Sequence, residues 1–181
     1  VLTVTGGVTV NGGTLYVNTG TLKVTGNLDI TGTNGWLKMI KETDVVEVAG
    51  NVTFNGAASN DRLTAGTLKV GGHFYQKGTS YSATNIPVNM NNRNSFTASG
   101  THKVVLNGTG RQDISFESAS DVNSHFQDLV IEKPAATINT LLSDDGEALD
   151  SGNFTASGTW GIGTVAYEGN GAWSDTNSCA P

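Results

Sequence analysis

Apolar and polar residues alternate in a pattern that recurs along the first 76 positions. Residues 2–10 read apolar-x-apolar-x-Gly-Gly-apolar-x-apolar, and closely similar forms begin 20, 24 and 22 residues apart, at residues 22–30, 46–54 and 68–76. Alternation with a period of two is typical of a strand with one buried face. A Gly-Gly or Gly-Asn pair marks a sharp bend. Each copy therefore predicts two short strands that meet at a glycine corner. The predicted corners are Gly6, Gly26, Gly50 and Gly72.

The nearly constant spacing of the copies helps to distinguish between two arrangements of these strands, a sandwich and a coil. A sandwich of hairpins also uses short alternating strands, and it stays an alternative. Copies with the same apolar positions favour a coil, because each rung then stacks its apolar residues on those of the last. The sequence thus predicts an all-β protein, a parallel β-solenoid (β-helix) of imperfect rungs of about 20–24 residues. Its hand is left open.

The second half repeats differently. The hexapeptide at residues 96–101 returns 58 residues later, at residues 154–159. Further strands are expected at 113–116, 126–132 and 137–142. We divide the chain into regular rungs (1–77), a loop insertion where the apolar pattern lapses (78–95), and less regular rungs that continue the same stack (96–181). A true domain boundary at the insertion is the alternative.

The composition agrees with many short strands and tight turns. The chain has 24 Gly and 24 Thr, and only 14% of its residues are charged. Thr favours pleated, half-buried strands, and Gly supplies the left-handed positions of tight turns. Long helices require a different composition, rich in Ala, Leu, Glu and Lys.

The net charge of −6 argues against a nucleic-acid partner. Its distribution is uneven: residues 1–93 carry seven Lys/Arg and five Asp/Glu, or +2, whereas residues 94–181 carry three and eleven, or −8. Unlike ends of an elongated molecule favour head-to-tail association. Ordinary variation of surface charge is the alternative.

Three further features bound the setting. Cys179 is the only cysteine, so it either pairs with another molecule or marks an excision boundary. No apolar run approaches the roughly 18 residues of a membrane span. Val1 already lies inside a strand pattern, which indicates a mature or excised piece of a longer protein.

Several of these stretches resemble the repetitive β-helical regions of large bacterial surface and secreted proteins. The resemblance rests on residues 22–30, 68–76, 96–110 and 126–131. The repetitive regions that these stretches resemble are those of filamentous-haemagglutinin-like adhesins and S-layer-associated proteins. The resemblance implies an extracellular or cell-surface location and a scaffold or adhesive role. It supplies no functional residues.

The histidines and the clustered acidic residues are the candidate metal ligands of the chain. His73 occupies a position held by Asn or Gly in other copies, which favours a corner role over a ligand role. His102 and His125 are expected to be exposed. The acidic group Asp144, Asp145, Glu147 and Asp150 is a weak Ca²⁺ candidate, since its spacing does not match an EF-hand loop and a solvated acidic turn explains it.

A polysaccharide-cleaving β-helix would need two carboxylates on one face. Asp29, Asp113 and Glu117 are the candidates, although sequence spacing does not show that they meet. An ice-binding solenoid would need a long ladder of Thr-x-Thr. Thr3 and Thr5 begin one, but Lys23 stands at the corresponding position of the next rung.

The sequence therefore predicts an extracellular structural or adhesive rod or fibre segment that stacks end to end. We predict no enzymatic activity, no cofactor, no nucleic acid and no membrane span. A surface glycan or host ligand is considered as a partner, with residues 78–95 as the candidate adhesive patch. The alternatives are a β-helical protein that binds or cleaves polysaccharide and an ice-binding protein.

Overall fold

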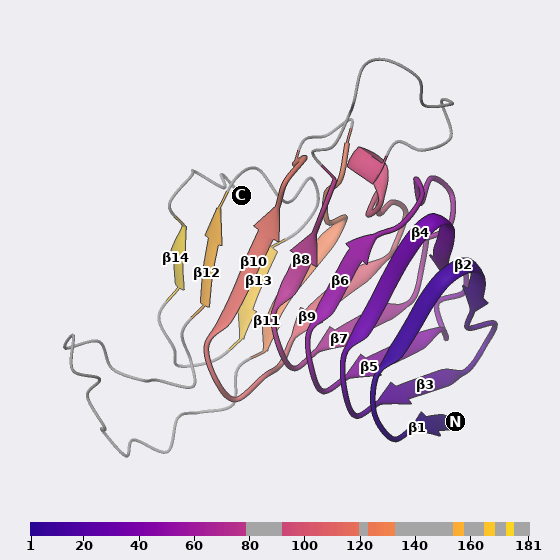
Figure 1. The fold of residues 1–181 in the computed structure, drawn as a ribbon. Coiled ribbons are helices and arrows are strands. Elements are labelled where there is room, and N and C mark those ends of the chain that lie inside the picture. Colours follow the sequence, from indigo (N-terminus) through magenta and orange to yellow (C-terminus); the bar gives the residue numbers. More distant parts are fainter. Residues whose placement is uncertain (79–91, 120–122, 133–153, 158–164, 169–172, 176–181) are drawn as a thin grey trace.

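The chain folds into a parallel β-solenoid, as the repeat predicts (Figure 1). The computed structural model describes residues 1–78, 92–119, 123–132, 154–157, 165–168 and 173–175. Two seven-stranded parallel sheets face each other along the stack. Their strands alternate between the sheets in chain order, so each coil contributes one strand to each sheet.

We call the sheet of odd-numbered strands sheet A and the other sheet B. Sheet A contains β1 (Leu2–Val4), β3 (Thr21–Val24), β5 (Val45–Val48), β7 (Thr67–Val70), β9 (Lys103–Leu106), β11 (Asp128–Glu132) and β13 (Val165–Glu168). Sheet B contains β2 (Val8–Tyr16), β4 (Leu28–Lys38), β6 (Val52–Asn55), β8 (Phe74–Gln76), β10 (Gln112–Phe116), β12 (Phe154–Ser157) and β14 (Trp173–Asp175). A short 3₁₀ helix, η2, covers Asn92–Asn94.

The register places the same position of each copy side by side. In sheet A, Leu2 pairs with Leu22, Leu22 with Val46, and Val46 with Leu68. Leu22, Val46 and Leu68 are buried, whereas Lys23 and Glu47, one position on, lie on the outer face. Alternation along each strand thus becomes an apolar ladder inside the coil and a polar row outside.

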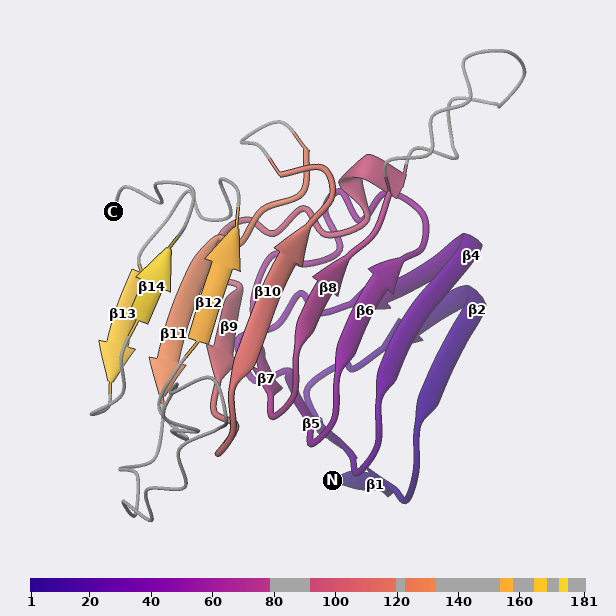
Figure 2. The same cartoon turned by 60° about the vertical axis from the view of Figure 1, so that its left-hand side comes forward.

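Strand pairing continues across the insertion (Figure 2). β7 pairs with β9, and β8 pairs with β10, with residues 71–102 and 77–111 between them. Residues 79–91, most of the predicted insertion, lie outside the described residues. Next to them Ser95 is buried, and its hydroxyl lies 3.2 Å from the carbonyl oxygen of Phe54.

In the coils that the structure describes from Val8 to His125, a third side lies between the two sheets. β2 and β4 extend onto it, where Tyr16 pairs with Lys38. Isolated parallel bridges then join Met39 to Leu63 and Leu63 to Ala98. The two copies of the repeated hexapeptide occupy different places, because Ala98 lies on this third side while Phe154–Ser157 is strand β12 of sheet B.

Phenylalanine side chains fill the middle of the core. Phe96 contacts Phe54 and Phe74 edge-on, with ring centroids 4.6 and 4.9 Å apart. Phe126 contacts Phe74 and Phe116 at 4.8 and 5.0 Å. Edge-to-face packing of this kind adds about 0.5–1.5 kcal/mol per pair beyond the area buried. Three of these residues, Phe54, Phe74 and Phe116, come from sheet B strands and two from the third side, so the cluster ties the sides of the coil together.

Asp44 holds a tight turn before β5. It is fully buried, and its Oδ1 accepts a hydrogen bond from the N–H of Thr19 at 2.5 Å. Its Oδ2 accepts from the N–H groups of Ile40 and Lys41 at 2.9 and 3.0 Å. A buried carboxylate is tolerated when hydrogen bonds replace its water. Here it satisfies three backbone donors from two successive coils.

We expect the substitution Asp44→Ala to lower the free energy of unfolding by about 3 kcal/mol, because three backbone N–H groups lose their charged, buried acceptor. Chemical denaturation of the purified variant measures this. Asp29→Ala, which removes a carboxylate from the outer face of β4, serves as the matched control and should change stability by about 0.5 kcal/mol or less. Equal effects of the two substitutions would contradict a capping role for Asp44.

Candidate functional site

The predicted glycine corners form one column along the solenoid. The N–H of Gly26 donates to the carbonyl oxygen of Gly6 at 2.9 Å, that of Gly50 to Gly26 at 3.1 Å, and that of Gly72 to Gly50 at 2.9 Å. A Cβ on Gly26 would lie 2.7 Å from the backbone carbon of Gly6. Gly26, Gly50 and Gly72 therefore need to be glycine because each contacts the backbone of the preceding corner, whereas Gly6 is favoured as glycine by its φ of +109°.

A polar ladder runs beside this column. The side-chain oxygen of Asn27 accepts from the N–H of Asn51 at 2.9 Å, and that of Asn51 accepts from the N–H of His73 at 2.8 Å. His73 continues the ladder, since its Nδ1 accepts from the N–H of Asp113 at 3.0 Å. This places His73 at a corner and gives it the bonding role of the asparagines below it. The contacts account for the ring without any ligand.

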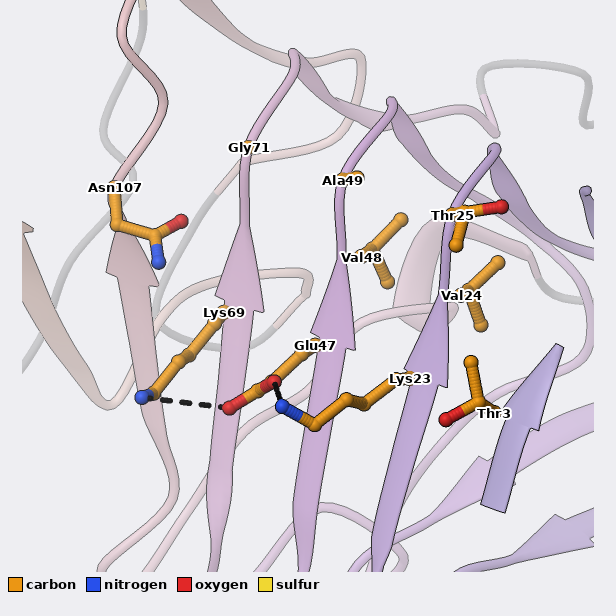
Figure 3. A pocket seen from close by; sticks show the side chains of 10 residues that line it. All are labelled: Thr3, Lys23, Val24, Thr25, Glu47, Val48, Ala49, Lys69, Gly71 and Asn107. Atoms are coloured by element: carbon orange, nitrogen blue, oxygen red, sulfur yellow. Dashed lines mark ion pairs between the residues drawn. The ribbon is translucent and has the colours of Figure 1, made fainter. Parts of the chain in front are cut away.

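The outer face of sheet A bears a shallow groove of about 350 Å³ (Figure 3). Lys23, Glu47 and Lys69 stand on three adjacent strands along one side of it. Glu47 lies 2.6 Å from the amine of Lys23 and 3.6 Å from that of Lys69. The hydrogen bond and charge of Lys23 lower the pKa of the Glu47 carboxyl against a smaller opposing effect of burial, and Lys69 adds to the lowering.

This row of charges supports pairing between strands. Opposite charges directly across neighbouring strands stabilise a sheet by a few tenths of a kcal/mol to about 1 kcal/mol. The second row of the groove contains the short side chains of Thr25 and Ala49 and the bare Gly71. Both lysines already have Glu47 as their partner, so the groove offers little charge to a ligand.

His102 and His125 are buried, so the prediction that they are exposed was wrong. His102 is fully buried against Phe96, with ring centroids 5.8 Å apart, and neither of its ring nitrogens has a hydrogen-bond partner among the described residues. Desolvation lowers the pKa of His102 from 6.5 to about 3. The ring nitrogens of His125 face the carbonyl oxygens of Asn123 and Ala98 at 2.9 and 2.8 Å. Both rings point into the coil from the third side. The polar residues next to them in the sequence do not predict this burial.

The three carboxylates considered for polysaccharide cleavage lie apart. Asp113 and Glu117 are four residues apart in extended chain, which separates their Cα atoms by about 13 Å. Asp29 lies three strands away from β10, or about 14 Å. Asp113 contacts Arg111 at 2.9 Å, and Glu117 contacts Lys77 at 3.1 Å. These backbone separations are longer than the roughly 5–10 Å between the carboxyl groups of a glycosidase pair, and both Asp113 and Glu117 are paired with a base.

The predicted calcium candidate, Asp144, Asp145, Glu147 and Asp150, lies outside the described residues, as does Cys179. Within the described part of the chain, no group of three or more His, Cys, Asp or Glu side chains is arranged to hold a metal ion. No helix among these residues is long and apolar enough to cross a membrane.

A more polar cleft, of about 600 Å³, lies on the third side. Thr14 and Tyr16 at the end of β2, Lys38 at the end of β4, and residues 60–62 before β7 line it. The Lys38 amine lies 4.5 Å from the centre of the Tyr16 ring. Sequence reasoning missed this cleft because its residues fall between the copies of the repeat, and only the coiling brings them together.

The β1–β2 end of the solenoid exposes the apolar ladder. Leu2 is 63% exposed, whereas its ladder neighbours Leu22 and Val46 are 6% and 0% exposed. β1 and β2 are the edge strands of their sheets. A groove of about 320 Å³ opens beside them, lined by Leu2, Leu15 and Val17 among others. Among the described residues, both sheets thus have an unpaired edge on the same end, beside the exposed part of the apolar ladder.

In comparison with known proteins, no family model, no curated protein and no solved structure matches the chain. The function must therefore be argued from the surfaces described above.

Proposed function

We propose that this chain is an extracellular structural or adhesive solenoid segment that stacks end to end with a second copy of itself. The open β1–β2 end carries the proposal. Leu2, on the end strand, is 63% exposed, whereas Leu22, which has a strand on either side, is 6% exposed. A further coil stacked on β1 would bury Leu2 to a similar extent. Burial of apolar surface is the main favourable term in association.

The end also lacks the features that normally prevent strand addition. Natural edge strands are blunted by charged residues, proline or bulges that twist the edge away. Residues 1–20 contain no charged residue and no proline. β2 does carry an irregularity between Asn11 and Gly13, but β4 pairs on both sides of it. A neighbouring coil can pair in the same way.

A second copy suits this end for two reasons. At the far end of each sheet β13 and β14 are the edge strands, so head-to-tail contact would join parallel edges to parallel edges. Residues 1–93 carry +2 and residues 94–181 carry −8, which favours unlike ends meeting. Such a heterologous contact does not close on itself and produces filaments. The extracellular setting is supported by the resemblance to bacterial surface proteins.

An ice-binding function has less support. The outer row of sheet A places Lys23, Glu47 and Lys69 after Thr3. The matching row of sheet B includes Asp29 and Tyr75. Neither row is a continuous threonine ladder along these described strands.

Negative-stain electron microscopy across a concentration series tests the stacking. We expect filaments of uniform width for the unaltered chain and short rods for Thr9→Pro. The N–H of Val8 donates to the carbonyl oxygen of Asn27, directly before β4. Because neighbouring residues of a parallel strand bond in opposite directions, the N–H of Thr9 points to the open edge. Proline removes only that donor and leaves the β2–β4 bonds of Val8 in place.

Thr9→Val is the matched control, since it keeps the N–H and the β-branched shape. It should assemble like the unaltered chain. Far-UV circular dichroism confirms that both variants fold. Isolated rods of the unaltered chain at every concentration would overturn self-assembly, and filaments of Thr9→Pro would show that the β2 edge is not the contact.

A further inference from the structure

The cleft on the third side contains two cations that form no ion pair with a carboxylate of the described residues. Lys38 lies over the Tyr16 ring at 4.5 Å, and the guanidinium of Arg62 lies over the Trp36 ring at 4.3 Å. Neither forms an ion pair within the described part of the chain. By contrast, Lys23, Lys69, Lys77 and Arg111 all contact a carboxylate.

Both cations are held in place. The Arg62 guanidinium also donates from Nη1 to the carbonyl oxygen of Asn60 at 3.1 Å, and the Trp36 indole N–H donates to the carbonyl oxygen of Ala58 at 3.0 Å. Stacking on an aromatic face holds a cation by about 0.5–1 kcal/mol at exposed sites while leaving its N–H donors free. A ligand anion would therefore meet pre-positioned donors, and less side-chain entropy is lost on binding.

The remaining residues supply contacts of another kind. The Tyr16 side chain is 38% exposed, and Thr14 and Asn60 add a hydroxyl and an amide to the wall. Asp61 adjoins them, so the cleft carries a net charge of +1, from two bases and one acid, in a chain of net charge −6. A volume of about 600 Å³ falls in the range of small-molecule sites.

We infer that this cleft, formed by Tyr16, Lys38, Asn60 and Arg62 on three successive coils, binds an acidic saccharide. The guanidinium of Arg62 and the amine of Lys38 bind a carboxylate or sulfate group, since a guanidinium fork matches such anions geometrically. Thr14 and Asn60 hydrogen-bond to sugar hydroxyls. This inference is separate from end-to-end stacking, because every residue named lies within one copy of the chain.

Isothermal titration of the full chain with dextran sulfate, polygalacturonate and uncharged dextran tests the inference. We expect binding of one or both acidic polymers and none of dextran. The double variant Lys38→Gln/Arg62→Gln should bind the acidic polymers at least tenfold more weakly. The matched control, Lys23→Gln/Lys69→Gln, removes the same charge from the groove on sheet A and should bind as the unaltered chain does.

Equal weakening by the two double variants would overturn the site and indicate general attraction of a polyanion. Binding of neither acidic polymer would also overturn it. Repeating the titration with Thr9→Pro separates the two proposals, since this variant should lose filaments and keep saccharide binding. Thermal unfolding of each variant shows that a loss of binding is not a loss of fold.

Discussion

His102→Leu is expected to make the protein more resistant to acid. In the folded state burial lowers the pKa of His102 from 6.5 to about 3. Between these two values the unfolded chain takes up a proton on this residue and the folded chain does not. The wild-type chain therefore loses about 1.4 kcal/mol of stability for each pH unit below 6.5, and the loss levels off near pH 3. Leucine cannot take up the proton, so this loss disappears.

At pH 4.5 the difference should reach about 3 kcal/mol in favour of His102→Leu. At pH 7 His102 is neutral in the folded and the unfolded chain alike. We therefore expect His102→Leu to be as stable as the unaltered chain or about 1 kcal/mol more stable, because two buried nitrogens without partners among the described residues are removed. Urea denaturation at a series of pH values from 7.5 to 4 measures both. All other titratable groups are shared, so parallel stability curves for the two proteins would contradict a buried neutral His102.

Gly50→Ala should destabilise the solenoid through the corner column. A Cβ at this position would lie 2.8 Å from both the carbonyl carbon and oxygen of Gly26, and would also overlap the side-chain oxygen of Asn27. The two Gly26 atoms belong to the backbone of the neighbouring coil, which cannot rotate away as a side chain can. We expect a loss of about 3 kcal/mol and a drop of about 6–12 °C in melting temperature for a chain of this size.

Gly110→Ala is the matched control for this substitution. Gly110 is exposed, and a Cβ there meets no atom within 4 Å. Its melting temperature should stay close to that of the unaltered chain. If Gly50→Ala melts no lower than Gly110→Ala, the close stacking of the corners is wrong.

These results bear on why the solenoid can repeat without being identical. Backbone contacts at the corners and backbone pairing in the two sheets set the distance between coils, so outward-facing residues can differ from one coil to the next. On the outer face of sheet A this variation places Lys23, Glu47 and Lys69 in a row of ion pairs. On the third side it places Lys38 and Arg62 in the cleft that we propose as a binding site. A rod with functional side chains at selected coils follows from this division.

The sequence by itself favoured the coil over a sandwich of hairpins and predicted the direction of its side chains. Apolar residues at every second position, with glycine in the middle of each copy, allow successive copies to bury the same face, and the parallel pairing of the strands decides for the coil. Leu22, Val46 and Leu68 accordingly stack in one ladder. The corner role of His73 was also readable, because aligning the copies puts it at the position of Asn27 and Asn51.

Tertiary structure alone decided what happens between the copies. Residues 96–99 and 154–157 have the same sequence but pair with different neighbours: Ala98 forms a bridge with Leu63 on the third side, whereas 154–157 pair with β10 in sheet B. His102 and His125 are buried because the third side turns inward there, which local polarity does not encode. The cleft of Tyr16, Lys38 and Arg62 exists only because coiling brings together residues up to 46 positions apart, a separation set by rung length rather than by any local pattern.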